Sequence, residues 1–339
     1  MNKVLEEDIR EFASTFALGD DLKDSTFLIT GATGLIGSIL IHCLFALRKD
    51  IRIVAPVRNI AKAKEKLEAY EQLQLIECDL ESFDYSEIGD VDYIIHCAAP
   101  TASRFFVEHP VETFHSICNI SDRILDYTRS HKIKSMVYLS SLEVYGQILD
   151  DSKPVTEDMQ GYLDPMDVRS SYPMAKRAVE NLCCLYAKEY GVPVKVARLT
   201  QTTGAGCDPD DNRVIVQFAR LAARGEDIVL RTTGESARPY CYTTDAVSAI
   251  LYILLKGKNA EAYNVANEET YISAKELAFF VKGHVNPSID VRFELSDKCG
   301  YAPVTKHRLD TGKISNLGWS ARRSKCEMFS KLIEALKEK

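Results

Sequence analysis

The sequence lacks the features that mark nucleic-acid-binding, disulfide-bonded and membrane-spanning proteins. It carries a formal net charge of −7 and no run of basic residues, which argues against nucleic acid as a main partner. None of its ten cysteines stands in a CxxC pair, so we expect reduced core thiols and no metal site. No apolar run is long enough to span a bilayer, and residues 1–24 lack a signal-peptide core. We therefore expect a cytoplasmic protein with no membrane partner.

What the chain does contain is an alternation of short apolar strands and helical stretches. Hydrophobic residues make up 46% of the 339, enough for one large domain or two joined closely. This alternation predicts right-handed βαβ units and a Rossmann-type doubly wound parallel sheet of the α/β class. Ligands are then expected at the carboxyl ends of the strands. The expected strands are 25–30, 51–56, 73–77, 93–97, 136–139 and 194–199.

A glycine-rich turn joins the first expected strand to the helix that follows it. The sequence GATGLIG occupies residues 31–37, and the apolar helix 40–48 comes next. Glycines at such a turn let backbone N–H groups approach a pyrophosphate, which the helix N-terminus also attracts. The turn therefore predicts contacts to NAD or NADP from Gly31, Thr33, Gly34, Leu35, Ile36 and Gly37.

Other predicted dinucleotide contacts follow the later strands. Arg58 stands where an acid would normally receive the adenosine ribose, so it either holds the 2′-phosphate of NADP, stacks on adenine or is a solvated arginine. Asp79 follows the third strand and is a candidate for the adenine amino group. The small Ala98 and Ala99 would let the nicotinamide side lie close to the backbone. Asn119, in the expected helix 111–130, completes this set.

A tyrosine and a lysine stand four residues apart where another helix is expected to begin. Tyr172 and Lys176 share a face of that helix, and Pro173 suits its first turn. A free tyrosine titrates near pH ~10, so a proton acceptor at neutral pH needs a shift of roughly three units, and a nearby ammonium is the obvious source. The spacing alone is equally typical of a solvated helix.

After residue 200 the elements become shorter and more interrupted, which predicts a smaller substrate-binding lobe. We divide the chain into an N-terminal helical extension (1–24), a dinucleotide-binding domain (25–200) and this lobe (201–339). Arg231 and Arg238 flank a turn containing Gly234, where they could grip a diphosphate from two sides. A solvated face is the alternative for either arginine.

Several motifs together resemble the extended short-chain dehydrogenase/reductases, in particular the nucleotide-sugar epimerase/dehydratase family. The similarity covers nearly the whole chain. It rests on GATGLIG at Gly31, the Asp79–Leu80 pair, HCAAP at His96, SSLEVYG at Ser140 and YPMAK at Tyr172, with the later segments 198–206, 237–247 and 317–319.

This resemblance implies roles for individual residues. Tyr172 would be the acid/base that takes a proton from a sugar hydroxyl. Lys176 would hold the nicotinamide ribose and depress the pKa of Tyr172, and Ser141 would hydrogen-bond the same oxygen. Leu80 would lie with Asp79 at the dinucleotide. Glu143 resembles the carboxylate of sugar dehydratases and UDP-glucuronate decarboxylases, and is either a base, an orienter of the sugar or a rim carboxylate paired with an arginine.

Two positions depart from the family pattern. The 4,6-dehydratases place an aspartate just before the glutamate, and decarboxylases usually have serine, whereas this chain has Leu142. A leucine cannot donate a proton, so dehydration is disfavoured. Gln201 replaces the family's asparagine, which usually touches substrate phosphate, and the substrate is therefore expected to be seated differently.

The sequence thus predicts an enzyme that oxidises a nucleotide sugar at C4 with bound NAD and reduces the keto intermediate after epimerisation or decarboxylation. The alternatives are an NADPH-dependent keto-sugar reductase, motivated by Arg58, a 4,6-dehydratase, and a protein that only senses a dinucleotide. Family members commonly pair through two long helices, so we expect a homodimer formed by 111–130 and the helix from Tyr172 to Tyr190.

Overall fold

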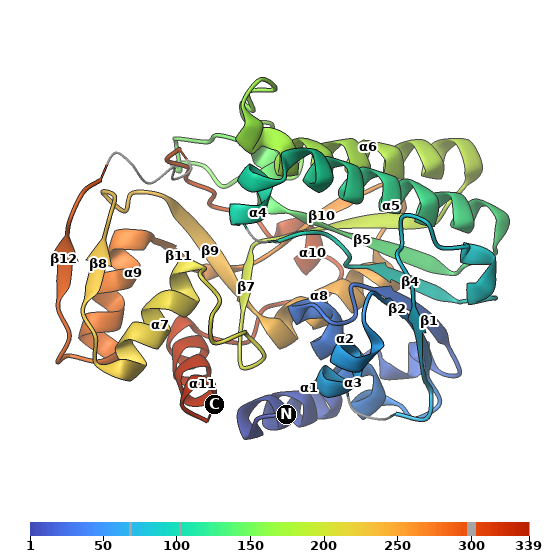
Figure 1. The fold of residues 1–339 in the computed structure, drawn as a ribbon, viewed down its shortest axis with the longest axis horizontal. Coiled ribbons are helices and arrows are strands. Elements are labelled where there is room, and N and C mark those ends of the chain that lie inside the picture. Colours follow the sequence, from blue (N-terminus) through green and yellow to red (C-terminus); the bar gives the residue numbers. More distant parts are fainter. Residues whose placement is uncertain (68–69, 102, 297–302, 339) are drawn as a thin grey trace.

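The computed structural model describes residues 1–67, 70–101, 103–296 and 303–338, which form a larger and a smaller lobe (Figure 1). Within the described chain, seven parallel strands form the main sheet, in the order β3-β2-β1-β4-β5-β6-β10. This confirms the predicted α/β fold. The strands are β1 (Thr26–Thr30), β2 (Arg52–Val57), β3 (Leu73–Glu77), β4 (Tyr93–His96), β5 (Ser135–Ser141), β6 (Val194–Leu199) and β10 (Ala262–Val265).

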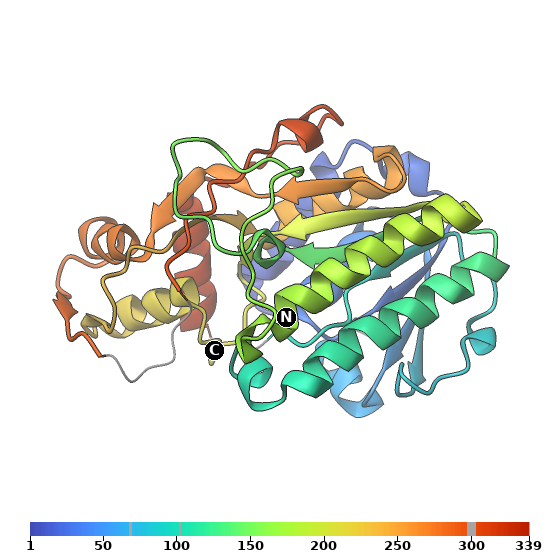
Figure 2. The ribbon, with the colours of Figure 1, turned by 90° about the horizontal axis from the view of Figure 1, so that it is seen from above.

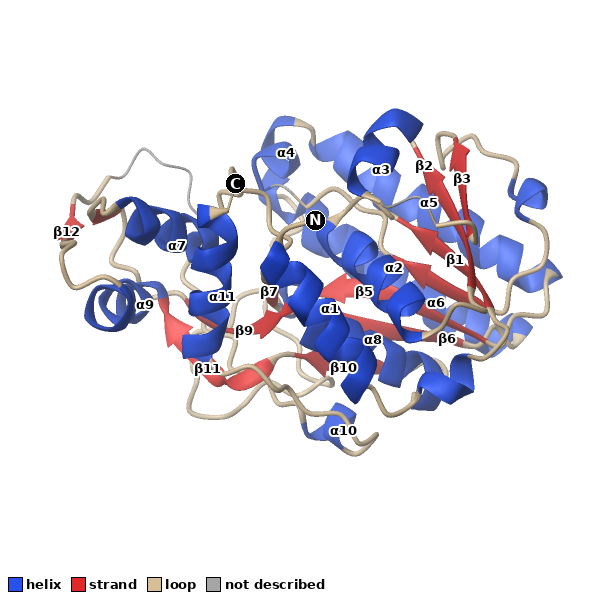
Figure 3. Cartoon of the chain, turned by 90° about the horizontal axis from the view of Figure 1, so that it is seen from below, coloured by secondary structure: helices blue, strands red, loops and turns tan. Residues whose placement is uncertain are grey.

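Helices cover both faces of this sheet because its strands are apolar on both sides. In β1, Phe27 and Ile29 pack on the face covered by α2 (Leu35–Leu47) and α8 (Thr243–Lys256), whereas Leu28 packs beneath α5 (Pro110–Ser130) and α6 (Ser171–Tyr190). Figure 2 shows α5 and α6 side by side, and Figure 3 shows the opposite face. Shorter elements connect these layers: η1 (Gly19–Leu22), α3 (Ile60–Lys66), η2 (Tyr85–Ile88), α4 (Ser103–Glu108), η3 (Leu142–Tyr145), η4 (Val168–Ser170) and α10 (Gly312–Ser315).

The smaller lobe is built around two short sheets. One sheet has the order β11-β9-β7, and the other pairs β12 with β8. Its elements are β7 (Gln201–Thr203), α7 (Val214–Arg224), β8 (Ile228–Leu230), β9 (Ala237–Tyr242), β11 (Asn267–Ser273), α9 (Ala274–Phe280), η5 (Val281–Val285), β12 (Val291–Phe293) and α11 (Lys325–Lys337). The lobes are not continuous in sequence, since α8 and β10 return to the main sheet. The predicted boundary at residue 200 therefore marks where the chain first leaves this sheet.

The N-terminal helix α1 (Lys3–Thr15) makes contacts with both lobes. Its apolar face packs on α2, and the buried carboxylate of Asp8 reaches residues further along the chain. Asp8 accepts a 2.5 Å hydrogen bond from the Tyr242 hydroxyl and lies 2.9 Å from the ammonium of Lys331 on α11. The predicted extension is thus an integral part of the packing.

Local sequence signals account for where several helices begin, but α6 begins without a side-chain cap. Both Ser273 and Ser324 form capping boxes with a glutamate three residues later. Helix α6 begins at Ser171, after Ser170, whose side chain makes no capping hydrogen bond. Helix α2 starts at Leu35, five residues earlier than the apolar pattern suggested, because Gly34 serves as its N-cap.

The cysteines are free thiols wherever the structure describes them. Most are buried or half-buried, as predicted, but Cys184 and Cys326 are exposed on helices, and Cys299 lies outside the described residues. A search of the described helices finds none with the length and apolar character needed to cross a bilayer.

Candidate active site

The glycine-rich turn has the close backbone approaches that its residues predict. Gly31 adopts a φ of +67°, and a Cβ atom there would lie 2.8 Å from the Ala98 nitrogen. A Cβ at Gly37 would lie 2.4 Å from the Gly31 carbonyl oxygen. Thr33 and Gly34 are exposed at the N-terminus of α2, whose first backbone N–H groups have no partner within the helix. The turn is therefore shaped to receive a phosphate.

A buried histidine supports the loop that faces this turn. His96 Nδ1 lies 2.7 Å from Thr30 Oγ1, and its Nε2 lies 3.0 Å from Ser121 Oγ. Ser121 donates to the Ile117 carbonyl, so it accepts from Nε2, and Thr30 then donates to Nδ1. Burial lowers the pKa of His96 to about 3, which keeps the ring neutral. Because Thr30 Oγ1 also accepts from the Ala98 nitrogen, the network fixes the predicted Ala98–Ala99 segment.

Arg58 and Asp79 follow neighbouring strands at the same edge of the sheet. Both side chains are exposed, and Asp79 Oδ1 accepts a hydrogen bond from the Glu81 nitrogen. Leu80, by contrast, is buried. A residue that we did not predict, Lys66, donates a 2.8 Å hydrogen bond to the Thr33 carbonyl and joins α3 to the glycine-rich turn.

Asn119 does not face the catalytic helix. It lies on the exposed side of α5, whereas Cys118, its neighbour, turns toward α6 with its sulfur 4.0 Å from the Ala175 carbonyl oxygen. Its predicted contact with the dinucleotide stays a prediction. The spacing of apolar residues along α5 predicts the helix but leaves its rotation about its own axis undetermined.

Ser141, Tyr172 and Lys176 come together at the carboxyl end of β5. Ser141 is the last residue of this strand, and its side chain hydrogen-bonds Tyr172 in the first turn of α6. The ring of Tyr172 stacks on Phe106, with centroids 4.3 Å apart and planes 9° apart. Lys176 Nζ donates a 2.7 Å hydrogen bond to the Leu139 carbonyl and lies 5.8 Å from the centroid of the Tyr172 ring. The three predicted catalytic residues thus share one small region.

The electrostatic environment of Tyr172 differs from the prediction. Burial and the Glu143 carboxylate raise the pKa of Tyr172, and only the hydrogen bond from Ser141 lowers it. The expected depression of this pKa by Lys176 is therefore wrong for the protein's own groups. Burial in turn lowers the pKa of Lys176 to about 8, with Glu180 opposing the shift. At neutral pH the phenol carries its proton and most of the lysine is cationic.

Polar side chains gather where the larger lobe meets the smaller one. Burial raises the pKa of Glu143, while the charges of Arg238 and Arg169 oppose this shift. Gln201 pairs in register with Tyr240, two residues beyond Arg238 on the neighbouring strand β9. The charge of Arg238 also acts on His307, a residue that we did not predict. We call Glu143, Gln201, Arg238, Tyr240 and His307 the junction cluster.

The second arginine predicted for a diphosphate lies apart from this cluster. Arg231 follows β8, is exposed, and forms an ion pair with Glu294 just after β12. Its guanidinium is therefore engaged at the outer sheet of the smaller lobe. Of the two predicted arginines, the structure brings Arg238 together with Glu143 and leaves Arg231 outside.

A buried ion pair ties the catalytic elements to one another. Arg198 on β6 binds Glu180 on α6 through Nη2–Oε2 (2.7 Å) and through Nε, and its Nη1 donates to the Tyr145 hydroxyl (2.9 Å). The Ser140 hydroxyl donates to the same Glu180 (2.5 Å). Strand β5, η3 and α6, which carry Ser141, Glu143 and Tyr172, thus meet at one ion pair.

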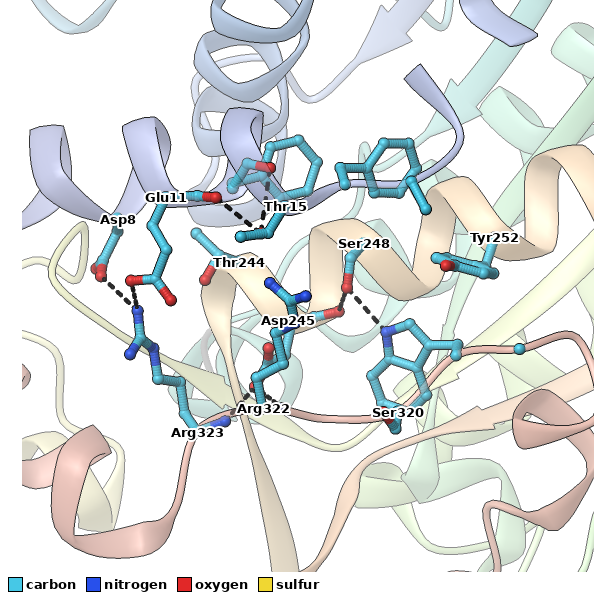
Figure 4. A pocket seen from close by; sticks show the side chains of 15 residues that line it. Asp8, Glu11, Thr15, Thr244, Asp245, Ser248, Tyr252, Ser320, Arg322 and Arg323 are labelled. Atoms are coloured by element: carbon cyan, nitrogen blue, oxygen red, sulfur yellow. Dashed lines mark hydrogen bonds and ion pairs between the residues drawn. The ribbon is translucent and has the colours of Figure 1, made fainter. Parts of the chain in front are cut away.

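A surface pocket lies away from the predicted site, and the polar groups around it hold two segments of the chain together. It lies between α1, α8 and residues 318–323 and contains none of the predicted site residues (Figure 4). Asp245 accepts hydrogen bonds from the backbone nitrogens of Arg322 and Arg323, and Trp319 donates to Ser248. These polar contacts fasten the C-terminal segment to α8.

Comparison with known proteins agrees with this geometry. A model of the NAD dependent epimerase/dehydratase family matches residues 27–266. UDP-glucuronic acid decarboxylase 3 of Arabidopsis thaliana is 30% identical over 269 residues, which cover 78% of this chain and 76% of the plant protein. UDP-glucuronic acid decarboxylase 2 of the same plant is 27% identical over 311 residues, covering 91% of this chain and 67% of the relative.

Solved structures share the fold. The UDP-glucose 4-epimerase of Thermotoga maritima superposes with a TM-score of 0.80 at 23% identity, covering 92% of this chain and 99% of the epimerase. The UDP-glucuronic acid 4-epimerase of Bacillus cereus gives a TM-score of 0.78 at 21% identity, covering 92% and 99%. As the motifs predicted, the chain belongs to the NAD dependent epimerase/dehydratase family.

Proposed function

We propose that this protein decarboxylates UDP-glucuronate through transient oxidation of the sugar at C4, with NAD as its resident cofactor. The relatives of similar sequence are UDP-glucuronic acid decarboxylases, which supports this choice of substrate. The observation that argues against elimination of a hydroxyl as the reaction is Leu142. Its side chain is 2% exposed and stands directly ahead of Glu143, where elimination of a sugar hydroxyl would need an acid. Loss of carbon dioxide needs no such acid.

The residues present fit a dinucleotide. The glycine-rich turn leaves no room for a Cβ at Gly31 or Gly37, and the N-terminus of α2 opens beside it. Thr33, Gly34, Leu35 and Ile36 would hold the pyrophosphate, and Lys176 would hold the nicotinamide ribose. When bound, NAD supplies the acceptor for the hydrogen that leaves C4.

The chain's own side chains then transfer the protons and bind the C4 oxygen of the sugar. With NAD bound, the positive charges of the nicotinamide ring and of Lys176 would favour the phenolate of Tyr172. In that form Tyr172 takes the proton of the C4 hydroxyl, and Ser141 donates a hydrogen bond to the same oxygen. The resulting C4 ketone is β to the C6 carboxylate, so the C5–C6 bond breaks, carbon dioxide leaves and its electron pair moves toward the ketone oxygen. A proton is then added at C5, and Tyr172 returns its proton to the C4 oxygen when the ketone is reduced. Atoms balance with no net oxidation of the sugar.

Glu143 is suited to donate the C5 proton. Burial raises its pKa, so its carboxyl retains a proton to a higher pH than an exposed glutamate would. Arg238 and Arg169 oppose this shift, and the carboxyl therefore remains able to give up the proton. This combination supports an acid/base role over that of a carboxylate fixed at the rim.

The direct test is incubation of the protein with UDP-glucuronate without added dinucleotide, followed by mass spectrometry of the nucleotide sugar. We expect a product lighter by one carbon dioxide. A product of unchanged mass that separates as the C4 epimer would refute decarboxylation and establish an epimerase. Unchanged substrate would refute both.

The dinucleotide that copurifies with the protein tests the cofactor separately. Mild denaturation releases it, and mass spectrometry identifies it. We expect NAD. Finding NADP instead would favour a keto-sugar reductase in which Arg58 holds the 2′-phosphate, because this exposed guanidinium replaces the usual acid at the end of β2.

We also propose that two copies associate through α5 and α6. These helices lie side by side on an outer face of the larger lobe (Figure 2) and expose apolar side chains, among them Phe114 (39% exposed) and Leu185 (51%). Covering such residues is favourable at about 25 cal/mol per Å² of apolar surface. We expect sedimentation to give a dimer and Leu185→Glu to give a monomer with an unchanged melting temperature. Leu149→Glu, exposed on another segment, is the control, and a monomeric wild type would contradict the proposal.

A further inference from the structure

The junction cluster contains a buried histidine with one unused ring nitrogen. His307 is 3% exposed, and its Nε2 lies 2.8 Å from the carbonyl oxygen of Gly146. A carbonyl oxygen only accepts hydrogen bonds, so Nε2 must carry the hydrogen. The Nδ1 atom is buried and has no hydrogen-bond partner among the described residues.

In the neutral ring Nδ1 therefore carries no hydrogen and can only accept a hydrogen bond. Burial and, to a smaller extent, the charge of Arg238 lower the pKa of His307 to about 4, although the hydrogen bond to Gly146 opposes this shift. The ring stays neutral at physiological pH. Leaving a polar atom buried and unpaired typically costs about 1–3 kcal/mol, so such an atom needs an explanation.

Strand register places this nitrogen on the same face as the other polar groups of the cluster. An isolated bridge pairs Lys306 with Ala237 in parallel. The backbone nitrogen of His307 donates a 2.9 Å hydrogen bond to the Ala237 carbonyl. The next residues along each segment, His307 and Arg238, therefore share the opposite face. Tyr240, two residues further along β9, lies on that face as well.

A second unpartnered atom lies on this face. Gln201 pairs in register with Tyr240, and its buried Oε1 has no hydrogen-bond partner in the described part of the chain. Two unpaired acceptors thus accompany Arg238 and Glu143 at the junction. A ligand that satisfies both must bring hydrogen-bond donors, and a phosphate or carboxylate has none at neutral pH. Sugar hydroxyls do.

We propose that His307 is a substrate-binding residue whose Nδ1 accepts a hydrogen bond from a hydroxyl of the nucleotide sugar, on either the hexose or the ribose. This inference rests on the proposed nucleotide-sugar substrate. It assigns Arg238 to the anionic part of that substrate and His307 to an adjacent hydroxyl. The neutral histidine offers the hydroxyl an acceptor, which an arginine at this position could not.

The test variant is His307→Gln, whose amide N–H can still donate to the Gly146 carbonyl while its oxygen points away from the side of Nδ1, so that no acceptor remains at the Nδ1 position. Lys306→Gln is the matched control, since it changes the neighbouring side chain, which faces the other way. Binding is measured by calorimetry in a Tyr172→Phe background, in which turnover is expected to be slow, with UDP-glucuronate, UDP and 2′,3′-dideoxy-UDP. We expect His307→Gln to weaken UDP-glucuronate binding about tenfold, as loss of one hydrogen bond would.

The three ligands distinguish the source of the hydroxyl. A loss confined to UDP-glucuronate places the hydroxyl on the hexose. A loss shared by UDP but absent with dideoxy-UDP places it on the ribose. Equal losses with UDP and dideoxy-UDP, or no loss with any ligand, would overturn the proposal.

A measurement on unaltered His307 covers the case in which His307→Gln does not fold. In the Tyr172→Phe protein, the 15N resonance of His307 Nδ1 is expected to move when UDP-glucuronate is added, while that of Nε2 stays in place. An unmoved Nδ1 resonance at saturating ligand would refute the contact. Because these readouts report binding, a protein that binds but releases no carbon dioxide would refute the proposed reaction alone.

Discussion

Replacing Tyr172 with phenylalanine is expected to lower kcat about 10²- to 10⁴-fold, the usual contribution of a positioned acid/base. The phenyl ring preserves the stacking on Phe106, so the fold and the affinity for UDP-glucuronate should change little. What disappears is the oxygen that hydrogen-bonds Ser141 and takes the proton of the sugar. Turnover with UDP-glucuronate and calorimetric affinity, measured on the same preparation, separate these effects.

Tyr186→Phe provides the control for this variant. Tyr186 lies on the same helix, and its hydroxyl donates to Asp122 on α5. It should retain nearly full activity. If Tyr172→Phe kept kcat within tenfold of the wild type, Tyr172 would not be the acid/base, and the proposed proton path would be wrong.

Replacing Glu180 with glutamine is expected to destabilise the protein by about 3–5 kcal/mol, as breaking a buried ion pair typically does. The side chains of Arg198 and Glu180 are 8% and 12% exposed, so the guanidinium would remain in the interior without its carboxylate. Urea unfolding measures the change as a shift of the midpoint at constant slope. Part of the loss should return when Arg198 is also replaced by methionine.

Asp290→Asn is the matched surface control for this pair. The Lys282–Asp290 ion pair is 38% and 61% exposed, and its loss should cost less than about 1 kcal/mol. A Glu180→Gln protein no less stable than Asp290→Asn would show that the buried guanidinium is satisfied by its remaining partners. The tie between α6 and η3 would then be weaker than the contacts indicate.

Sequence patterns predicted the parts of the structure that depend on local signals. The strand spacing indicated the parallel sheet, and the motifs brought Ser141, Tyr172 and Lys176 to its edge because carboxyl ends of parallel strands meet there. The capping box at Ser273 is a signal of this local kind, because its two residues lie three positions apart.

The parts that depend on distant contacts could not be predicted. Strand β10 pairs with β6 across more than sixty residues, and nothing in its four residues indicates which sheet it joins. His307 belongs to no motif, and it reaches Gly146 only because the chain returns beside β9. The raised pKa of Tyr172 depends on burial by Phe106 and α6, which spacing alone does not reveal.

The bridging helix α1 has a consequence for how the two lobes can move. Because Asp8 holds Tyr242 at the end of β9 and Lys331 on α11, while the same helix packs on α2, a hinge between the lobes would have to stretch a buried ionic contact. Substrate capture by wide opening is therefore disfavoured at this side of the molecule. We expect entry and release instead at residues 147–167, which lie away from α1 (Figure 1) and whose Tyr162 and Met166 are largely exposed.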